Sequence, residues 1–142
     1  MEERRASEAG SFESRIAEHR LLDQGFGRFV AAASAGDAGR ALEAIEAFDG
    51  EMRRHMEHEE RDVYRGAGDG KLISRPGEDE AARLAREMRL EHVQLRELSA
   101  MVCRLLAEKR DLSGALRLAA NLARRWDSHT TREEREVFRS GS

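Results

Sequence analysis

Histidine and glutamate recur in this sequence within a duplicated pattern. Residues 55–64 and residues 129–138 both read His-x-x-x-Glu-Glu-Arg-x-Val-aromatic. One further histidine precedes each copy at a similar distance, His19 before the first copy and His92 before the second. Imidazole nitrogens and carboxylate oxygens, with no thiolate among them, are typical ligands of iron, manganese or zinc. The pattern therefore favours a metal site built from two equivalent halves of the chain.

The spacing within each copy predicts that its histidine and glutamate share one side of a helix. Residues four positions apart lie on the same face, one turn from each other. His55 and Glu59 have this spacing, and so do His129 and Glu133. The apolar residues around each pair recur at the same three- and four-residue steps, which places both pairs on the buried stripe of a helix.

The two single histidines also fall in apolar stripes. His19 and His92 each stand between large apolar residues three or four positions away on either side. A buried carboxylate without a partner is costly, so two buried glutamates beside four imidazoles call for a cation. A lone core histidine is more often a hydrogen-bonded structural residue. That alternative is disfavoured because four of the five histidines are in phase, on four different helices.

Helical periodicity defines the elements that must position these residues. The expected helices run from Phe12 to Ala33, from Asp37 to Arg65, from Glu78 to about Lys109, and from a cap at Asp111 or Ser113 to Val137. Ser11 and Asp37 are the expected N-caps of the first two helices. The halves 12–66 and 78–139 repeat each other. We therefore predict one domain over residues 1–142, an all-α, up-down-up-down antiparallel four-helix bundle with an approximate internal two-fold axis.

Composition excludes several other classes of protein. The chain has 142 residues, which is the length of one ordinary domain, and its net charge of -3 provides no basic surface for nucleic acid. No apolar run approaches the ~20 residues that a membrane-spanning helix needs. Cys103 is the only cysteine, so no internal disulfide can form. With no secretory signal at the start of the chain, these features predict a cytoplasmic protein.

The whole constellation resembles the hemerythrin-like family of HHE cation-binding domains, from His19 to Phe138. The family's order is a histidine, then His-x-x-x-Glu, then a histidine, then His-x-x-x-Glu, on successive helices. The resemblance implies metal ligands at His19, His55, Glu59, His92, His129 and Glu133. It also implies two iron ions that share both carboxylates and an oxo or hydroxo bridge, with zinc or manganese as alternative metals. A ferritin-like di-iron bundle is disfavoured because the sequence contains no Glu-x-x-His.

The sequence departs in two places from the oxygen-carrying hemerythrins. Those proteins carry a second histidine on the third helix and an aspartate on the fourth. Here Met88 and Arg96 stand one turn to either side of His92, and Glu133 replaces the aspartate. Four histidines and two shared glutamates leave an open position on each ion if the geometry is octahedral. A simple reversible oxygen carrier is therefore a less apt description than a centre that reacts with its ligand.

We accordingly expect a non-haem di-iron protein that binds dioxygen, nitric oxide or peroxide, for sensing, storage or detoxification. The alternative is a di-iron enzyme that disproportionates peroxide or acts in nitric oxide or iron–sulfur stress chemistry. The repair proteins of this family carry an additional cysteine-bearing segment before the first helix. The corresponding residues here contain no cysteine, which disfavours a repair role.

Other residues of these segments have simpler expected roles. His58 lies about 60° around the helix from His55, which favours a position at the helix boundary, partly solvated or in contact with a ligand, with a fifth imidazole ligand as the alternative. Tyr64 and Phe138 are equivalent in the repeat and are expected to close the core at the helix ends, and Trp126 to pack above the site. The glutamates expected to be solvated or paired with arginine are Glu57, Glu60, Glu91 and Glu134, with contact between Glu91 and the site as an alternative.

Overall fold

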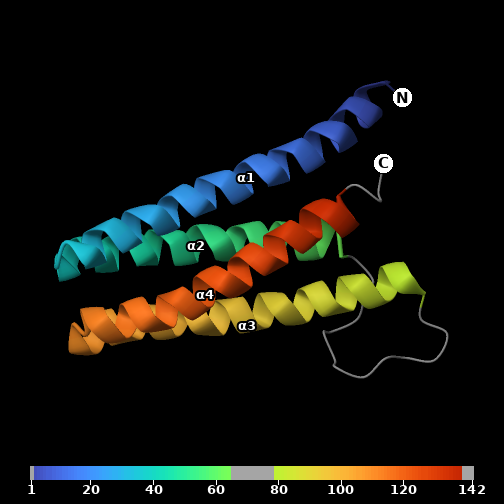
Figure 1. Cartoon of the computed structure of the whole chain (residues 1–142). Helices are drawn as coiled ribbons and strands as arrows, with labels where there is room; N and C mark the ends of the chain where they lie inside the picture. Colours follow the sequence, from blue (N-terminus) through green and yellow to red (C-terminus); the bar gives the residue numbers. More distant parts are fainter. Residues whose placement is uncertain (1, 65–78, 139–142) are drawn as a thin grey trace.

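The computed structural model describes residues 2–64 and 79–138. Within those ranges the chain forms four α-helices and no strand: α1 (Glu2–Ser34), α2 (Ala38–Asp62), α3 (Glu80–Lys109) and α4 (Leu112–Arg132). A π-helical segment, η1 (Glu133–Val137), continues α4. Figure 1 shows that α1 runs antiparallel beside α2, and α3 beside α4. The predicted all-α fold, an antiparallel bundle of four helices, is confirmed.

Aspartate side chains fix the beginnings of the three later helices. Asp37, Asp79 and Asp111 each accept a hydrogen bond from the backbone N–H three residues further on, at 3.0, 2.7 and 2.8 Å. Such caps satisfy one of the donors that a helix start leaves unpaired. Of the expected caps, Asp37 and Asp111 are confirmed. The turns between paired helices use left-handed backbone, at Gly36 with φ of 79° and at Arg110 with φ of 51°.

The ends of the helices differ from the sequence prediction in four places. α1 begins at Glu2 instead of Phe12 and runs through Ser11, so Ser11 is not an N-cap; the preceding glutamate, arginine and alanine residues are good helix formers. α2 ends at Asp62 and α3 begins at Glu80; Arg65 and Glu78, the expected end and start, lie outside the described residues. The π-helical segment after α4 was not expected, because the apolar spacing that predicts a helix does not distinguish π-helical from α-helical turns.

An apolar core fills the bundle between the two short turns and the histidine-bearing segments. Figure 1 places both turns at the same end of the molecule. Fully buried side chains from every helix meet there, none more than 1% exposed; they include Phe29, Ile45, Phe48, Val102 and Leu122. Burial of this kind contributes roughly 25 cal/mol per Å² of apolar surface. The apolar core therefore stabilises the packing of the four helices independently of the polar residues.

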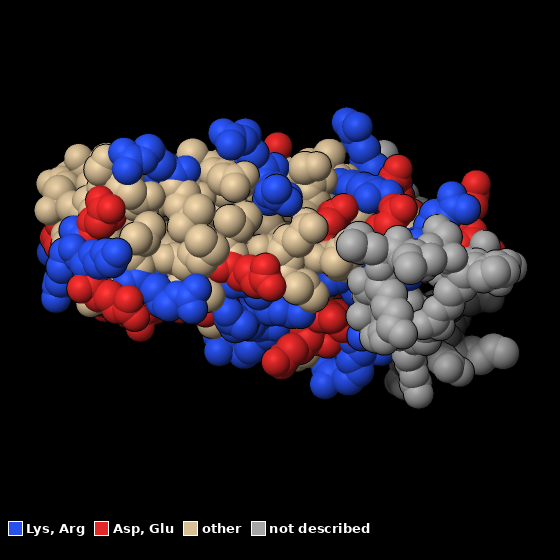
Figure 2. All heavy atoms as spheres, turned by 90° about the horizontal axis from the view of Figure 1, so that it is seen from below, with Lys and Arg blue, Asp and Glu red and all other residues tan. Residues whose placement is uncertain are grey.

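The surface carries charges of both signs. Figure 2 shows lysine and arginine side chains interspersed with aspartate and glutamate on one face of the molecule, beside an uncharged stretch. No continuous basic patch is visible on the described part of that face. None of the helices in the described part is both long enough and apolar enough to cross a membrane.

Candidate metal centre

Six side chains singled out by the sequence converge beyond the apolar core, toward the end where α4 finishes. One histidine comes from each helix, one glutamate from α2 and the other from the start of η1. All six are buried, between 0% and 4% exposed. Among the described residues they form two overlapping groups that could each hold a metal ion: His19, His55, Glu59 and Glu133, and Glu59, His92, His129 and Glu133. We name these the α1/α2 group and the α3/α4 group.

The two glutamates belong to both groups, and their oxygens lie between histidines of the two pairs. Glu59 Oε2 lies 3.1 Å from Nε2 of His55, while its Oε1 lies 3.3 Å from Nε2 of His92. Glu133 Oε1 lies 3.2 Å from Nε2 of both His19 and His129. Each carboxylate therefore faces imidazoles of both halves of the chain, as a ligand shared between two ions would.

The inward-facing atoms of this cluster lack hydrogen bonds. Among the described residues, buried atoms without a hydrogen-bond partner include Nε2 of all four histidines, both carboxylate oxygens of Glu59 and Oε1 of Glu133. Buried polar groups in proteins are nearly always satisfied, and an unsatisfied buried carboxylate is especially costly. These orphaned nitrogens and oxygens are the atom types that bind iron, manganese or zinc. The residues present therefore fit a pair of such ions.

Carboxylates outside the centre contact the outer nitrogens of the two single histidines. Nδ1 of His19 donates a hydrogen bond to Glu134 at 3.0 Å. At the equivalent place in the repeat, Nδ1 of His92 lies 3.5 Å from the Glu60 carboxylate, an ion-pair distance rather than a hydrogen bond. Glu60 also accepts from Arg96 at 3.1 Å, so its predicted arginine pairing is confirmed. The prediction of a solvated or arginine-paired Glu134 is wrong, because that side chain turns inward to His19.

The histidines of the duplicated pattern have outer carboxylates of the same kind. Nδ1 of His55 donates to Glu18 at 2.5 Å, and Nδ1 of His129 donates to Glu91 at 2.7 Å. Glu91 also accepts from Arg132 at 3.1 Å, so both its predicted arginine pairing and the alternative of contact with the site are confirmed. Glu18 was missed, although the sequence held a signal: a glutamate directly precedes both His19 and His92. Because a carboxylate can only accept, each contact places the proton on Nδ1 and leaves Nε2 for the centre.

Aromatic rings cover the cluster on the side of the apolar core. The Trp126 ring centroid lies 5.7, 6.5 and 6.4 Å from those of His19, His55 and His129. Its Nε1–H donates to Asp23 on α1 at 2.8 Å. Trp126 therefore packs above the site as predicted, and the hydrogen bond to Asp23 ties α4 to α1 at that level.

Tyr64 and Phe138 cover the opposite side. Both are buried, at 1% and 3% exposure, as expected for residues that close the core. The Tyr64 hydroxyl also donates a hydrogen bond of 2.5 Å to Oε2 of Glu133, a contact the sequence did not predict. Burial and the nearby charge of Glu133 raise the pKa of Tyr64 far above its ordinary value. The phenol therefore stays protonated and acts as the donor.

The charges within the cluster support one another in the absence of an ion. Burial opposes the charged form of His19, but the carboxylates of Glu133 and Glu59, 3.2 and 3.8 Å from its Nε2, outweigh burial and raise the pKa of His19 to about 10. Burial and the charge of Glu133 likewise oppose ionisation of Glu59, yet the surrounding imidazoles lower its pKa to about 2. The pKa of Glu133 is also lowered, with the charge of His129 as the largest favourable cause. Protons on the histidines thus occupy the role that cations would take.

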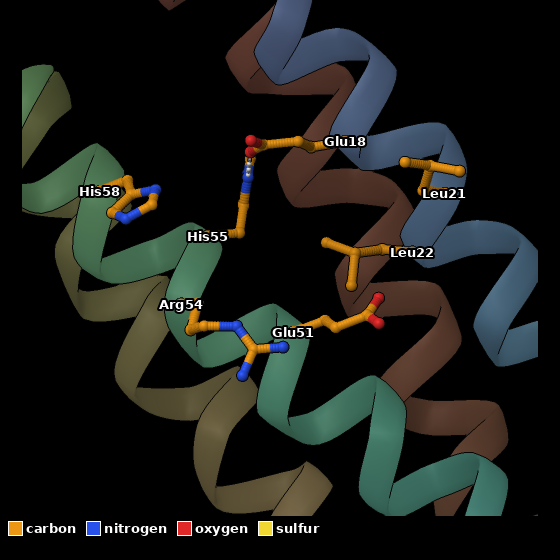
Figure 3. A pocket seen from close by; sticks show the side chains of 7 residues that line it. All are labelled: Glu18, Leu21, Leu22, Glu51, Arg54, His55 and His58. Carbon is orange, nitrogen blue, oxygen red and sulfur yellow. Dashed lines mark hydrogen bonds and ion pairs between the residues drawn. The ribbon is translucent and has the colours of Figure 1, made fainter.

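His58 lies outside the cluster. Its side chain is exposed, and it belongs to neither candidate group in the described part of the chain. It lines a cavity of about 210 Å³ between α1 and α2, and Figure 3 shows the side chains around that cavity. Glu18 and His55 point toward each other across the same cavity. The outer edge of the α1/α2 group therefore borders a hollow in the surface. The solvated position expected for His58 is confirmed.

Comparison with models of protein families identifies a related domain. The model of the hemerythrin HHE cation binding domain matches residues 15–140. This range includes the six buried histidine and glutamate residues. No curated protein and no solved structure matches the chain.

Proposed function

The chain belongs to the hemerythrin HHE cation binding domain family, and on that premise we propose that its buried cluster holds two metal ions. His19 and His55 would bind one ion, His92 and His129 the other, and Glu59 and Glu133 would be shared. The observation that supports this most directly is the set of orphaned inward-facing atoms. Their types favour iron, with manganese and zinc as alternatives.

The surrounding residues would orient and shield the ions. The outer carboxylates hold the imidazoles in the tautomer that offers Nε2 to a metal, a role that such carboxylates commonly have. Trp126 covers the ligands on one side, and Tyr64 and Phe138 cover them on the other. Tyr64 supplies an O–H donor directed at the shared carboxylate of Glu133. The ions would therefore lie in a largely water-free site.

We further propose that the loaded centre binds dioxygen, nitric oxide or peroxide, for sensing, storage or detoxification. A pair of redox-active ions supplies electron transfer to such a ligand. Six protein ligands, two of them shared, are few enough to leave coordination positions open. An enzyme that disproportionates peroxide, or that acts on nitric oxide in iron–sulfur stress, is the competing function for the same centre.

The test is reconstitution of the metal-free protein with ferrous iron without air, followed by exposure to each ligand. We expect two irons per chain and an absorption spectrum that changes reversibly with dioxygen or nitric oxide. Sustained release of oxygen from peroxide over many turnovers would instead establish the enzyme. A protein that binds iron but shows no response to any of the three ligands would contradict both functions.

Two neighbouring histidines on α2 provide a matched pair of variants. His55→Ala removes a buried inward-facing imidazole, and His58→Ala removes an exposed one. We expect His55→Ala to lose part of its iron and weaken the ligand-dependent spectrum, and His58→Ala to keep both in full. Equal loss in the two variants would show that the response does not come from the buried cluster.

A further inference from the structure

Tyr64 and Phe138 occupy equivalent places in the two halves of the molecule. The backbone N–H of each donates to the carbonyl oxygen of the shared glutamate five residues earlier, Glu59 or Glu133, at 2.9 Å. Each ring packs on one of the single histidines: the Tyr64 centroid lies 5.7 Å from that of His92, and the Phe138 centroid 5.8 Å from that of His19. The two positions therefore match in backbone and in packing, and they differ by one hydroxyl group.

That hydroxyl group acts on one of the two shared carboxylates only. The Tyr64 O–H donates to Oε2 of Glu133 at 2.5 Å, where both side chains are buried. Phe138 has no donor for Glu59, and within the described residues neither oxygen of Glu59 accepts a hydrogen bond. One carboxylate thus accepts a hydrogen bond from a fixed donor, and its repeat equivalent has no such donor.

The two carboxylates are oriented differently. Glu59 divides its oxygens, with Oε2 at 3.1 Å from His55 and Oε1 at 3.3 Å from His92. Glu133 instead places the single oxygen Oε1 at 3.2 Å from the histidines of both groups. Its Oε2 faces Tyr64 and lies 3.7 Å from Nε2 of His92. Oε2, the Glu133 oxygen that does not face the α1/α2 group, is therefore the one that accepts the hydrogen bond from Tyr64.

We propose that Tyr64 is a positioning residue that makes the two metal positions unequal, so that the first ion binds at the α1/α2 group. Each group faces Oε1 of Glu133 and one oxygen of Glu59, and none of these oxygens accepts a hydrogen bond, but Oε2 of Glu133 lies near the α3/α4 group alone. An ion at the α1/α2 group can therefore bind Glu133 only through Oε1, whereas the α3/α4 group has Oε2 as well. Once Oε1 of Glu133 binds the first ion, the α3/α4 group must use Oε2, whose electron density is drawn toward the Tyr64 hydroxyl. The inference rests on the proposed two-ion centre, and it assigns to this centre an order of filling.

The test follows the four buried histidines during a titration of metal-free protein with Zn²⁺. NMR spectra of ¹⁵N-histidine-labelled protein report which group is filled through the imidazole signals. Variants in which one histidine at a time is replaced assign each signal, and the exposed His58 is an internal reference. We expect the first equivalent of Zn²⁺ to shift the signals of His19 and His55. The second equivalent should shift those of His92 and His129.

Three variants test the hydroxyl group itself. Tyr64→Phe makes the two positions alike, so the ratio of the two stepwise dissociation constants should fall about tenfold, the equivalent of one hydrogen bond. Adding Phe138→Tyr to that variant moves the hydroxyl beside Glu59, and the order of filling should reverse. The single variant Phe138→Tyr should reduce the ratio as well, and it provides the test if Tyr64→Phe does not fold.

The possible outcomes separate this inference from the proposed function. A purely structural role for Tyr64 would weaken both binding steps equally and leave the order unchanged, which would overturn the inference. Wild-type order in the double variant would also overturn it. Fewer than two Zn²⁺ per wild-type chain, by contrast, would contradict the two-ion centre itself, whatever the variants do.

Discussion

The two ends of the bundle bury their side chains equally, but one end buries apolar side chains and the other buries ionisable ones. Toward the short turns, Phe29, Ile45 and Leu122 are fully buried and apolar. Toward the other end, His92 and Glu59 are just as deeply buried, at 0% exposure. Burial of apolar surface stabilises the fold, whereas burial of charge opposes it unless an opposite charge is close. We infer that the apolar end provides the stability that allows the polar end to hold a cluster of ligands.

This contrast predicts that the polar end depends on its ions and that the apolar end does not. Without metal, protons on the histidines must balance two buried carboxylates. With metal, the same atoms become ligands and need no proton.

Removal of the metal should have the largest effect on stability. Each ion that binds only the folded protein stabilises it by ~4 kcal/mol when free metal is about 1,000 times its dissociation constant. We therefore expect the metal-free protein to melt well below the loaded protein in calorimetry, with metal content measured in both samples. Identical melting temperatures would argue against ions bound at the buried cluster.

A cavity at the apolar end should destabilise both forms equally. Phe29→Ala removes a ring that is 0% exposed, and such truncations cost about 3–5 kcal/mol. Chemical unfolding should show the same loss with and without metal, and metal stoichiometry should not change. Val30→Ala on the exposed neighbour (37% exposed) serves as the control and should change stability by less than ~1 kcal/mol. Loss of metal in Phe29→Ala would show that the two ends are not independent.

The pH dependence of the metal-free protein should reveal its protonated histidines. The pKa of His19 is raised from 6.5 to about 10, so its contribution is complete below pH 6.5 and is lost as pH rises toward 10. The pKa of Glu59 is lowered from 4.5 to about 2, so its contribution is complete above pH 4.5 and is lost toward pH 2. Metal-free stability should therefore be greatest between about pH 4.5 and 6.5 and fall by on the order of 3 kcal/mol by pH 9.

The stability that bound metal adds should change with pH in the opposite sense. Metal ligation requires neutral imidazoles, so the additional stability given by metal should grow between pH 6 and pH 8. Thermal unfolding of paired samples across this range measures both trends. A metal-free protein whose stability rises from pH 6 to pH 9 would contradict the charge balance described here.

Loss of an outer carboxylate should have a smaller effect. Glu134→Gln weakens the acceptor that holds Nδ1 of His19, and removal of such partners typically costs 10–100-fold in metal affinity. Competition with a chelator measures this loss. Glu57→Gln, on the exposed face of α2, is the control and should bind metal like the wild type. Equal affinities in the two variants would mean that the outer carboxylates do not orient the ligands.

The sequence predicts the bundle and the convergence of the six residues because both follow from helical phase. His19, His55, Glu59, His92, His129 and Glu133 lie on apolar stripes with the three- and four-residue spacing of a helix, and the duplicated pattern relates the two halves. The contacts of Glu18 and Glu134 were harder to anticipate. They depend on how far each helix is rotated about its axis, which the spacing of apolar residues determines only within a fraction of a turn.

The contact between Tyr64 and Glu133 lies further beyond sequence reasoning. It joins the residues that follow α2 to the π-helical segment η1. Both chain segments bend back through hydrogen bonds that span five residues, and no residue pattern in the sequence announces that geometry. The repeat did identify Tyr64 and Phe138 as equivalent positions. The hydroxyl group by which they differ is therefore a difference between the two halves of the centre.

The most direct test of the central claim is the metal stoichiometry of ligand variants after identical reconstitution with ferrous iron. Glu59→Ala removes a ligand shared by both ions, whereas His92→Ala, like His55→Ala and His129→Ala, removes a ligand of one ion only. We expect Glu59→Ala to lose most of its iron and the absorption of the paired centre, and the histidine variants to keep more of both. Two irons per chain and an unaltered spectrum in Glu59→Ala would contradict the shared carboxylate, and with it the two-ion centre proposed for this protein.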